Sequence, residues 1–164
     1  MKQLKSLVLP FVALIVIPIL ILVVSGSTVF GFNFFSPFIQ VIVGLVACVA
    51  GIKLMVVTIR MFAELGEGTL APWDPTRKLV TAGIYGRVRN PMIAGVLVIL
   101  LGEALFLGSL GVFVWAIVFF VANTIYFHYS EEKALEQRFG EAYSEYRHNV
   151  PMWLPRLRPW HPQG

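Results

Sequence analysis

The stretch Gly83-Ile-Tyr-Gly-Arg-Val-Arg-Asn-Pro91 is short and basic, and it lies between two halves of the chain that are otherwise strongly apolar. Gly83 and Gly86 permit a tight or left-handed backbone. Pro91 disfavours helix at Asn90 and is itself tolerated at a helix start, so we expect a helix to begin there. The free N–H groups and the positive dipole end of that helix would face the preceding loop, an arrangement that suits an anionic or polar ligand group.

The composition is too apolar for a soluble domain of this length, because the chain has 164 residues of which 57% are hydrophobic and 13% are charged. Four apolar runs cover residues 7–24, 38–59, 92–108 and 110–127. Each run is close to the ~20 residues that a helix needs to cross a ~30 Å hydrocarbon core. The sequence therefore predicts an all-α membrane bundle of four spans.

The link between the last two runs, Gly108-Ser109-Leu110-Gly111, is short enough to predict a tight antiparallel helical hairpin. Beyond the fourth run, Leu135, Phe139, Ala142 and Tyr146 form an apolar stripe at helical spacing. This stripe predicts a cytoplasmic C-terminal helix over residues 131–147 that continues the fourth span. We treat the chain as a single membrane domain, in which residues 1–69 hold the first two spans and residues 70–158 form the half with the candidate site.

Basic residues are concentrated at the N-terminus, in the loop at residues 60–90 and in the C-terminal tail, whereas residues 25–37 and 108–111 carry no charge. The positive-inside rule then places both termini and the central loop in the cytoplasm. We expect a multi-pass protein of a prokaryotic inner (cell) membrane. The net charge of +4 indicates topology and contact with anionic lipid headgroups, since no nucleic-acid motif is present. The lone Cys48 predicts neither a disulfide nor a metal site.

Paired acids, Glu131 and Glu132, follow the fourth run, and a hairpin would return them to the membrane face where Asn90 and Pro91 lie. By themselves such acids could simply end a hydrophobic run. Next to a helix start they offer carboxylates for an ammonium or a ribose, together with N–H groups for a carboxylate. A ligand that carries an amino acid group and a sugar would match both. Glu103, an acid inside the third run, is interpreted as a structural residue away from this site.

An ordered set of motifs now points to a family. Residues 77–93, the Glu131–Glu132 pair, Phe139-Gly140-Glu141-x-Tyr143 and Val150-Pro151 followed by Pro155 together resemble the integral-membrane methyltransferases. These comprise the isoprenylcysteine carboxyl methyltransferases and the related phospholipid N-methyltransferases. The resemblance covers residues 70–158 and is specific as an ordered set.

The resemblance implies that S-adenosylmethionine is the cofactor. Two positions depart from the family pattern: Asn90 replaces the usual His before the turn proline, and Phe127 replaces the Arg that eukaryotic prenylcysteine enzymes place one turn before the acids. Asn90 can form hydrogen bonds but cannot titrate. Carried over by position, the residues that the resemblance assigns to the cofactor are Arg77, Lys78, Leu79, Val80, Tyr85, Asn90, Pro91, Met92, Ile93, Glu131 and Glu132.

The function implied by the resemblance is methyl transfer to a lipophilic or small amphipathic acceptor at the cytoplasmic membrane face. Carboxyl methylation of an isoprenylcysteine-like substrate is slightly favoured, and phospholipid N-methylation is the alternative. A carboxylate acceptor needs no base, whereas an amine must lose a proton, for which His128 and Glu132 are the candidate catalytic residues and His148 is a further neighbour. A non-catalytic membrane scaffold is the alternative from a different class.

Overall fold

The computed structural model describes residues 8–25, 36–66 and 77–162, and all regular secondary structure in these ranges is helical, as the sequence predicts. The boundary expected between residues 69 and 70 lies outside the described residues. The helices over residues 91–107 and 110–126 match their apolar runs to within one residue at each end. The helix over residues 37–65 instead continues six residues past the run at 38–59, into the segment expected to be a loop. In chain order the elements are α2 (Val8–Phe11), η1 (Val12–Val16), α3 (Ile17–Val24), α4 (Pro37–Leu65), η2 (Gly83–Gly86), α5 (Pro91–Leu107), α6 (Leu110–Tyr126), η3 (Phe127–Glu131), α7 (Glu132–Phe139) and α8 (Glu141–Asn149).

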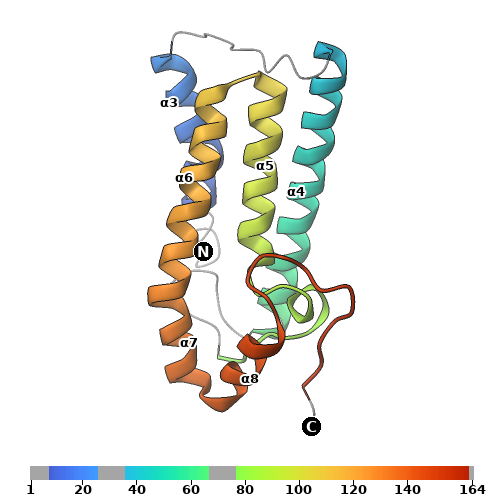
Figure 1. Ribbon diagram of the computed structural model, residues 1–164, viewed down its shortest axis with the longest axis vertical. Coiled ribbons are helices and arrows are strands. Elements are labelled where there is room, and N and C mark those ends of the chain that lie inside the picture. Colours follow the sequence, from blue (N-terminus) through green and yellow to red (C-terminus); the bar gives the residue numbers. More distant parts are fainter. Residues whose placement is uncertain (1–7, 26–35, 67–76, 163–164) are drawn as a thin grey trace.

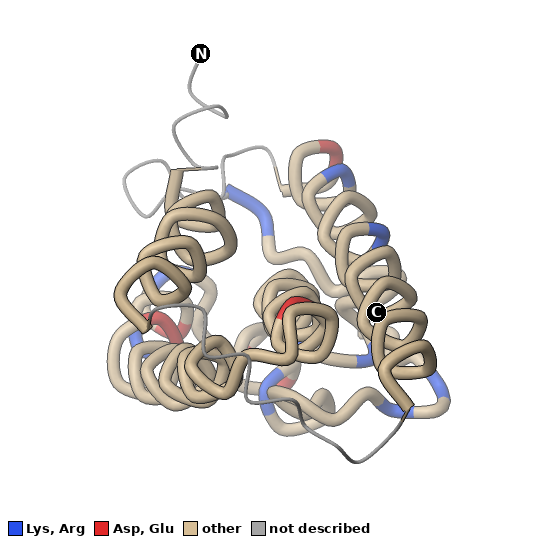
Figure 2. The backbone as a smooth tube through the Cα atoms, turned by 90° about the horizontal axis from the view of Figure 1, so that it is seen from above, with Lys and Arg blue, Asp and Glu red and all other residues tan. Residues whose placement is uncertain are grey.

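Helix α5 lies at the centre of the bundle, between α4 on one side and α6 on the other, and α3 packs on α6 (Figures 1 and 2). Among the described residues, the largest fully buried side chain is Leu100 of α5, which packs with Val96 and with Ala116 of α6. Helices α5 and α6 run antiparallel and are separated by Gly108 and Ser109 (Figure 1). The Ser109 side chain caps α6 by accepting a hydrogen bond from the Val112 N–H.

Glycines bring α4 and α5 into close contact. A Cβ atom added at Gly51 would lie 2.7 Å from the Gly95 carbonyl oxygen, and one added at Gly44 would lie 2.8 Å from the Gly102 carbonyl oxygen. Gly44 and Gly51 of α4 are therefore buried against α5, whereas Ala50 is exposed. Close backbone approach of this kind is typical of helix packing in membranes.

Two continuous helices are long and apolar enough to cross a membrane: Pro37–Leu65, and Leu110–Phe139, which joins α6, η3 and α7. Only 17% and 11% of their most apolar windows are buried, unlike the core helix of a soluble protein. The segments Val8–Val24 and Pro91–Leu107 are also apolar but shorter. At 1.5 Å per residue, the 17 residues of α5 extend about 25 Å, somewhat less than a hydrocarbon core of ~30 Å.

The predicted C-terminal helix over residues 131–147 is not continuous, which corrects the expectation from the apolar stripe. It is broken at Gly140, whose φ of 55° and ψ of −129° end α7 and begin α8. Glycine adopts this left-handed backbone without the Cβ clash that other residues meet. Because of the break, α8 turns back from α7 and returns toward the start of α5 (Figure 1).

Candidate functional site

The central turn, residues 83–90, forms a compact platform immediately before α5. Its first residue, Gly83, has a φ of 58°, consistent with the left-handed backbone expected at this position. Tyr85 and Asn90 are buried, with 6% and 9% of their surfaces exposed. Helix α5 begins at Pro91 as predicted, and Asn90 makes no side-chain capping hydrogen bond to it. The turn therefore presents a helix N-terminus whose N–H groups are not capped by the adjoining side chain.

Arg89, at the end of the central turn, pairs with Glu132, the first residue of α7. The Glu132 side chain is 4% exposed and that of Arg89 is 12% exposed. The Arg89 guanidinium also donates to the Tyr143 hydroxyl oxygen at 3.5 Å. The Arg89 backbone N–H donates to the Pro151 carbonyl at 3.0 Å. The expected proximity of an acid to the start of α5 is thus found, and Arg89 connects the acid to the turn that precedes this helix.

The second carboxylate oxygen of Glu132 faces two further basic side chains. Arg147 Nε of α8 lies 3.3 Å from Glu132 Oε2, and His128 Nδ1 lies 3.7 Å from the same atom. Arg147 also reaches Glu136 at 3.6 Å. An open depression of about 420 Å³ beside these groups is lined by Glu136, Ser144, Arg147 and His148. Pairing with two arginines compensates for the desolvation of a carboxylate that is almost completely buried.

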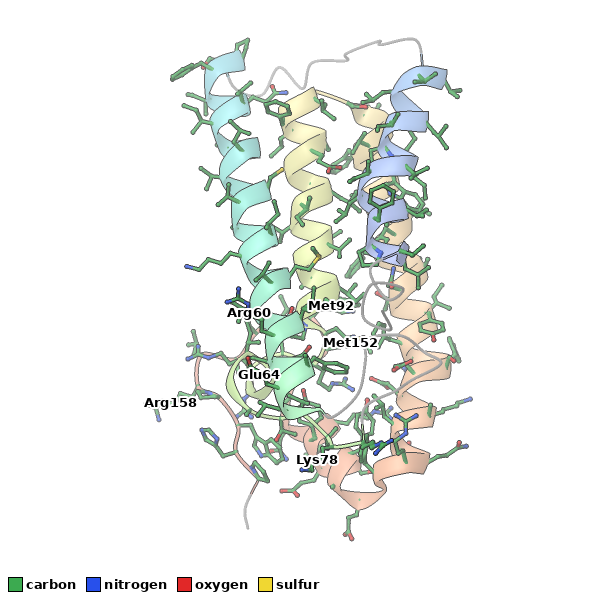
Figure 3. The ribbon with its side chains drawn as sticks, turned by 180° about the vertical axis from the view of Figure 1, so that it is seen from behind. Arg60, Glu64, Lys78, Met92, Met152 and Arg158 are labelled. Atoms are coloured by element: carbon green, nitrogen blue, oxygen red, sulfur yellow. The ribbon has the colours of Figure 1, made fainter. Side chains whose placement is uncertain are left out.

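The C-terminal strap, which we define as residues 150–160, wraps around the central turn (Figure 1). The Trp160 N–H donates to the Gly86 carbonyl at 2.8 Å, and the Arg156 N–H donates to the Arg87 carbonyl at 2.9 Å. In return the Arg87 guanidinium donates to the Leu157 carbonyl at 3.0 Å. The strap therefore holds the turn through its backbone. Figure 3 shows Met152 of the strap near the level of Met92 at the start of α5.

A buried tyrosine cluster connects α8 to the same turn. Tyr143, Tyr146 and Val150 pack together, with Leu79 and Trp160 against them. The Tyr146 hydroxyl donates to the Tyr85 carbonyl at 2.8 Å. Burial raises the pKa of Tyr146 well above its usual value, and burial followed by the Glu132 charge raises that of Tyr143. Both phenols are therefore neutral at physiological pH; the Tyr146 hydroxyl acts as a donor, and the Tyr143 hydroxyl accepts from Arg89.

The other predicted site residues are distributed around this turn. Arg77 and Lys78 are exposed, and their backbone N–H groups both donate to the Gly66 carbonyl, at 2.9 and 3.2 Å. Glu131 lies on a different face of its helix from Glu132. The Tyr126 hydroxyl donates to Glu131 Oε2 at 3.5 Å. His128 and His148 are exposed. Of the remaining predicted residues, Val80 and Pro91 are buried and Leu79, Met92 and Ile93 are half-buried.

Sequence reasoning missed Arg89 and Arg147. Arg89 lay inside the stretch that predicts the site, but its charge was attributed to membrane topology. The sequence gives no signal for Arg147, because it comes within reach of Glu132 only through the break at Gly140. In the described part of the chain no group of three or more His, Cys, Asp or Glu side chains could hold a metal ion.

Within the described part of the chain, Arg89 Nε is buried and has no hydrogen-bond partner, as is also true of Trp153 Nε1 in the strap. A buried donor without an acceptor is unfavourable, and an anionic ligand group beside it would remove that penalty. The uncapped start of α5 offers further N–H donors next to it. These groups fit the carboxylate of an amino acid moiety, one part of the ligand that the sequence indicates.

Comparison with known proteins identifies the class. The family model of the phospholipid methyltransferases matches residues 39–142, which is more than half of the chain. The chain therefore belongs to the phospholipid methyltransferase family. It is also 36% identical over 82 residues to a protein-S-isoprenylcysteine O-methyltransferase of Schizosaccharomyces pombe. That match covers 48% of this chain and 34% of the yeast protein, so the chain matches about a third of the length of this relative. No solved structure matches the chain.

Proposed function

We propose that this protein is a membrane methyltransferase that uses S-adenosylmethionine and methylates a lipophilic or small amphipathic acceptor at the cytoplasmic face of the membrane. Membership of the phospholipid methyltransferase family supports the reaction class. The observation that carries the site is the pairing of Arg89 with Glu132 beside the uncapped start of α5, with Arg89 Nε left without a partner.

The proposed topology has four spans, with both termini and the central turn in the cytoplasm. It rests on the two long apolar helices and on the two shorter ones. If the outer ends of α5 and α6 lie at the external boundary, the ~25 Å length of α5 brings Asn90 close to the inner boundary of the hydrocarbon core. A lipid acceptor would then meet the turn without its headgroup leaving the interface.

In the proposed complex, Arg89 Nε and the N–H groups of Met92 and Ile93 would hold the carboxylate of S-adenosylmethionine. Glu131 is the acid proposed for the ammonium or the ribose, since Glu132 is already engaged by Arg89 and Arg147. Glu132 therefore serves the site through Arg89. Tyr85, Asn90 and Pro91 are proposed to shape the pocket, and Arg77, Lys78, Leu79 and Val80 to border it.

When bound, S-adenosylmethionine supplies a methyl group on a positively charged sulfur. The protein residues contribute by aligning the acceptor and by excluding water, effects that together can be worth several kcal/mol. For a carboxylate acceptor no proton has to move. For an amine acceptor, His128 is the proposed base, because its side chain is exposed and its Nδ1 lies 3.7 Å from Glu132 Oε2, which can orient the ring.

The likeness to the isoprenylcysteine enzyme of yeast favours carboxyl methylation slightly. Phospholipid N-methylation is the second candidate, favoured by the family model. The purified protein, incubated with membrane lipid extract or an isoprenylcysteine analogue and methyl-labelled donor, distinguishes the two. Label that mild base releases as volatile methanol indicates a methyl ester, and label that remains on a non-volatile headgroup after base treatment indicates an amine. The absence of transfer and of saturable donor binding would favour a non-catalytic scaffold.

A further inference from the structure

Glu132 bridges two parts of the chain that the sequence separates widely. One carboxylate oxygen pairs with Arg89 of the central turn, and the other lies 3.3 Å from Arg147 Nε of α8. Because the Glu132 side chain is only 4% exposed, the loss of either arginine leaves part of a buried carboxylate uncompensated.

We propose that Arg147 is a positioning residue for the donor site: it fixes the Glu132 carboxylate, and Glu132 in turn fixes the Arg89 guanidinium next to the start of α5. This inference rests on the proposed function only in its consequence for donor binding. The coupling between Arg147 and the central turn is independent of any ligand.

Arg147 is itself held from the side of α8. Its NH1 group lies 3.6 Å from Glu136 Oε2, and the Ser144 hydroxyl donates to Glu136 Oε1 at 3.1 Å. The guanidinium therefore spans Glu132 and Glu136, one helical turn apart on α7. This bridge fixes the angle between α7 and α8 across Gly140, where the backbone alone would permit other angles.

Arg89, on the other side of Glu132 from Arg147, is also held by contacts to and just after α8. The Arg89 backbone N–H donates to the Pro151 carbonyl just after α8, and its guanidinium lies within reach of the Tyr143 hydroxyl on α8. A displacement of α8 would therefore alter both the support of Arg89 and the charge that neutralises Glu132. His128 lies farther from Glu132 Oε2 than Arg147 Nε does, at 3.7 Å against 3.3 Å, and its side chain is more exposed.

An ordinary surface ion pair would behave differently. The Arg147 side chain is 40% exposed, and exposed pairs contribute little to stability. If Arg147 formed only such a surface ion pair, its removal would have no effect on the central turn. Removal of a positioning residue should alter the turn and weaken the affinity for the methyl donor, while the stability of the helical bundle stays unchanged.

The test compares Arg147→Ala and Arg147→Lys with Lys133→Ala, which removes the same charge from an exposed position on α7. Amide hydrogen exchange over residues 83–90 reports on the turn, and calorimetric titration with S-adenosylhomocysteine reports on the donor site. We expect Arg147→Ala to speed exchange in the turn and to weaken the affinity, each by about tenfold. Arg147→Lys should restore part of both, and the melting temperature of the membrane helices should stay near that of the wild type.

Turn exchange and affinity for Arg147→Ala equal to those for Lys133→Ala would overturn the proposal. If Arg147→Ala does not fold, Arg147→Lys decides: exchange like the wild type together with wild-type affinity would contradict a role for the guanidinium bridge between Glu132 and Glu136. If the wild-type protein does not bind S-adenosylhomocysteine, the proposed function fails, and the exchange measurement still determines whether Arg147 supports the turn.

Discussion

The guanidinium of Arg89, two residues before the start of α5, pairs with the carboxylate of Glu132, 43 residues further along the chain. Both side chains are largely buried. The pair connects the central turn to the helix that continues α6, and it therefore brings together two polar segments that the apolar helices separate in sequence. A buried pair that lacks one partner is strongly destabilised, so the two residues have to be considered together.

The contact between α4 and α5 should not tolerate a larger residue in place of its glycines. A Cβ at Gly51 would lie 2.6 Å from Ile99 Cγ1 and 2.7 Å from the Gly95 carbonyl oxygen. We predict that Gly51→Val destabilises the bundle by about 1–3 kcal/mol, because overpacking forces the helices apart. Thermal unfolding in detergent micelles measures the effect. Ala50→Val, at the adjacent exposed position, is the matched control, and equal stability of the two variants would contradict the close contact.

Substitution at Gly83 should damage the central turn. A side chain there requires a residue other than glycine at a φ of 58°, and its Cβ would lie 2.5 Å from the end of the Met61 side chain. The strain of such a backbone is about 1–3 kcal/mol. We predict that Gly83→Val loses affinity for S-adenosylhomocysteine while it still inserts into membranes. Ala82→Val, at the exposed neighbouring position, should insert equally well and keep its affinity. Calorimetric titration of both variants measures this, and full affinity of Gly83→Val would count against the site.

The buried tyrosines predict a loss of stability in alkali. Burial raises the pKa of Tyr146 above its usual value of about 10, so the folded protein favours the neutral phenol. This contribution is complete below pH 10 and declines as the pH rises above that value. Tyr146→Phe should cost roughly 1–3 kcal/mol at neutral pH, because the buried Tyr85 carbonyl loses its donor. Melting curves between pH 8 and 11 should also show a smaller alkaline decline for this variant; an identical decline would argue that Tyr146 is not the group responsible.

The strap should contact the lipid. Leu154 and Leu157 are 80% and 92% exposed, although hydrogen bonds hold the strap against the turn. An environment-sensitive dye on Leu157→Cys, in a Cys48→Ala background, should report an apolar environment in nanodiscs and be quenched by brominated lipids. The same dye on Lys133→Cys should remain in water. Equal exposure of both dyes to water would show that the strap does not enter the interface.

The main helices could be predicted from the sequence because apolar runs of membrane length dominate it. Residues 92–108 predicted α5 to within one residue, since Pro91 and Gly108 bound it. The proximity of Glu132 to the start of α5 also followed from the short link at Gly108 and Ser109. This part depends on chain connectivity and not on side-chain detail.

The break at Gly140 could not be predicted from periodicity. The apolar side chains of α7 and α8 both face the tyrosine cluster, so the stripe from Leu135 to Tyr146 continues across the break as if the helix were straight. With the helix taken as straight, Arg147 would lie 15 residues from Glu132, about 22 Å along the helix axis and far out of contact. The ion pairs of Glu132 thus depend on a backbone angle that the hydrophobic pattern does not encode.

The most direct test of the account is titration of the purified protein with S-adenosylhomocysteine, comparing the wild type with Glu131→Ala, Arg89→Met and the exposed control Lys133→Met. We predict saturable binding to the wild type and to Lys133→Met, and the loss of at least about tenfold in affinity for Glu131→Ala and Arg89→Met. Circular dichroism should show that helix content is retained in all four proteins. Unchanged affinity in both site variants, or no binding to the wild type, would contradict a methyl-donor site at the start of α5.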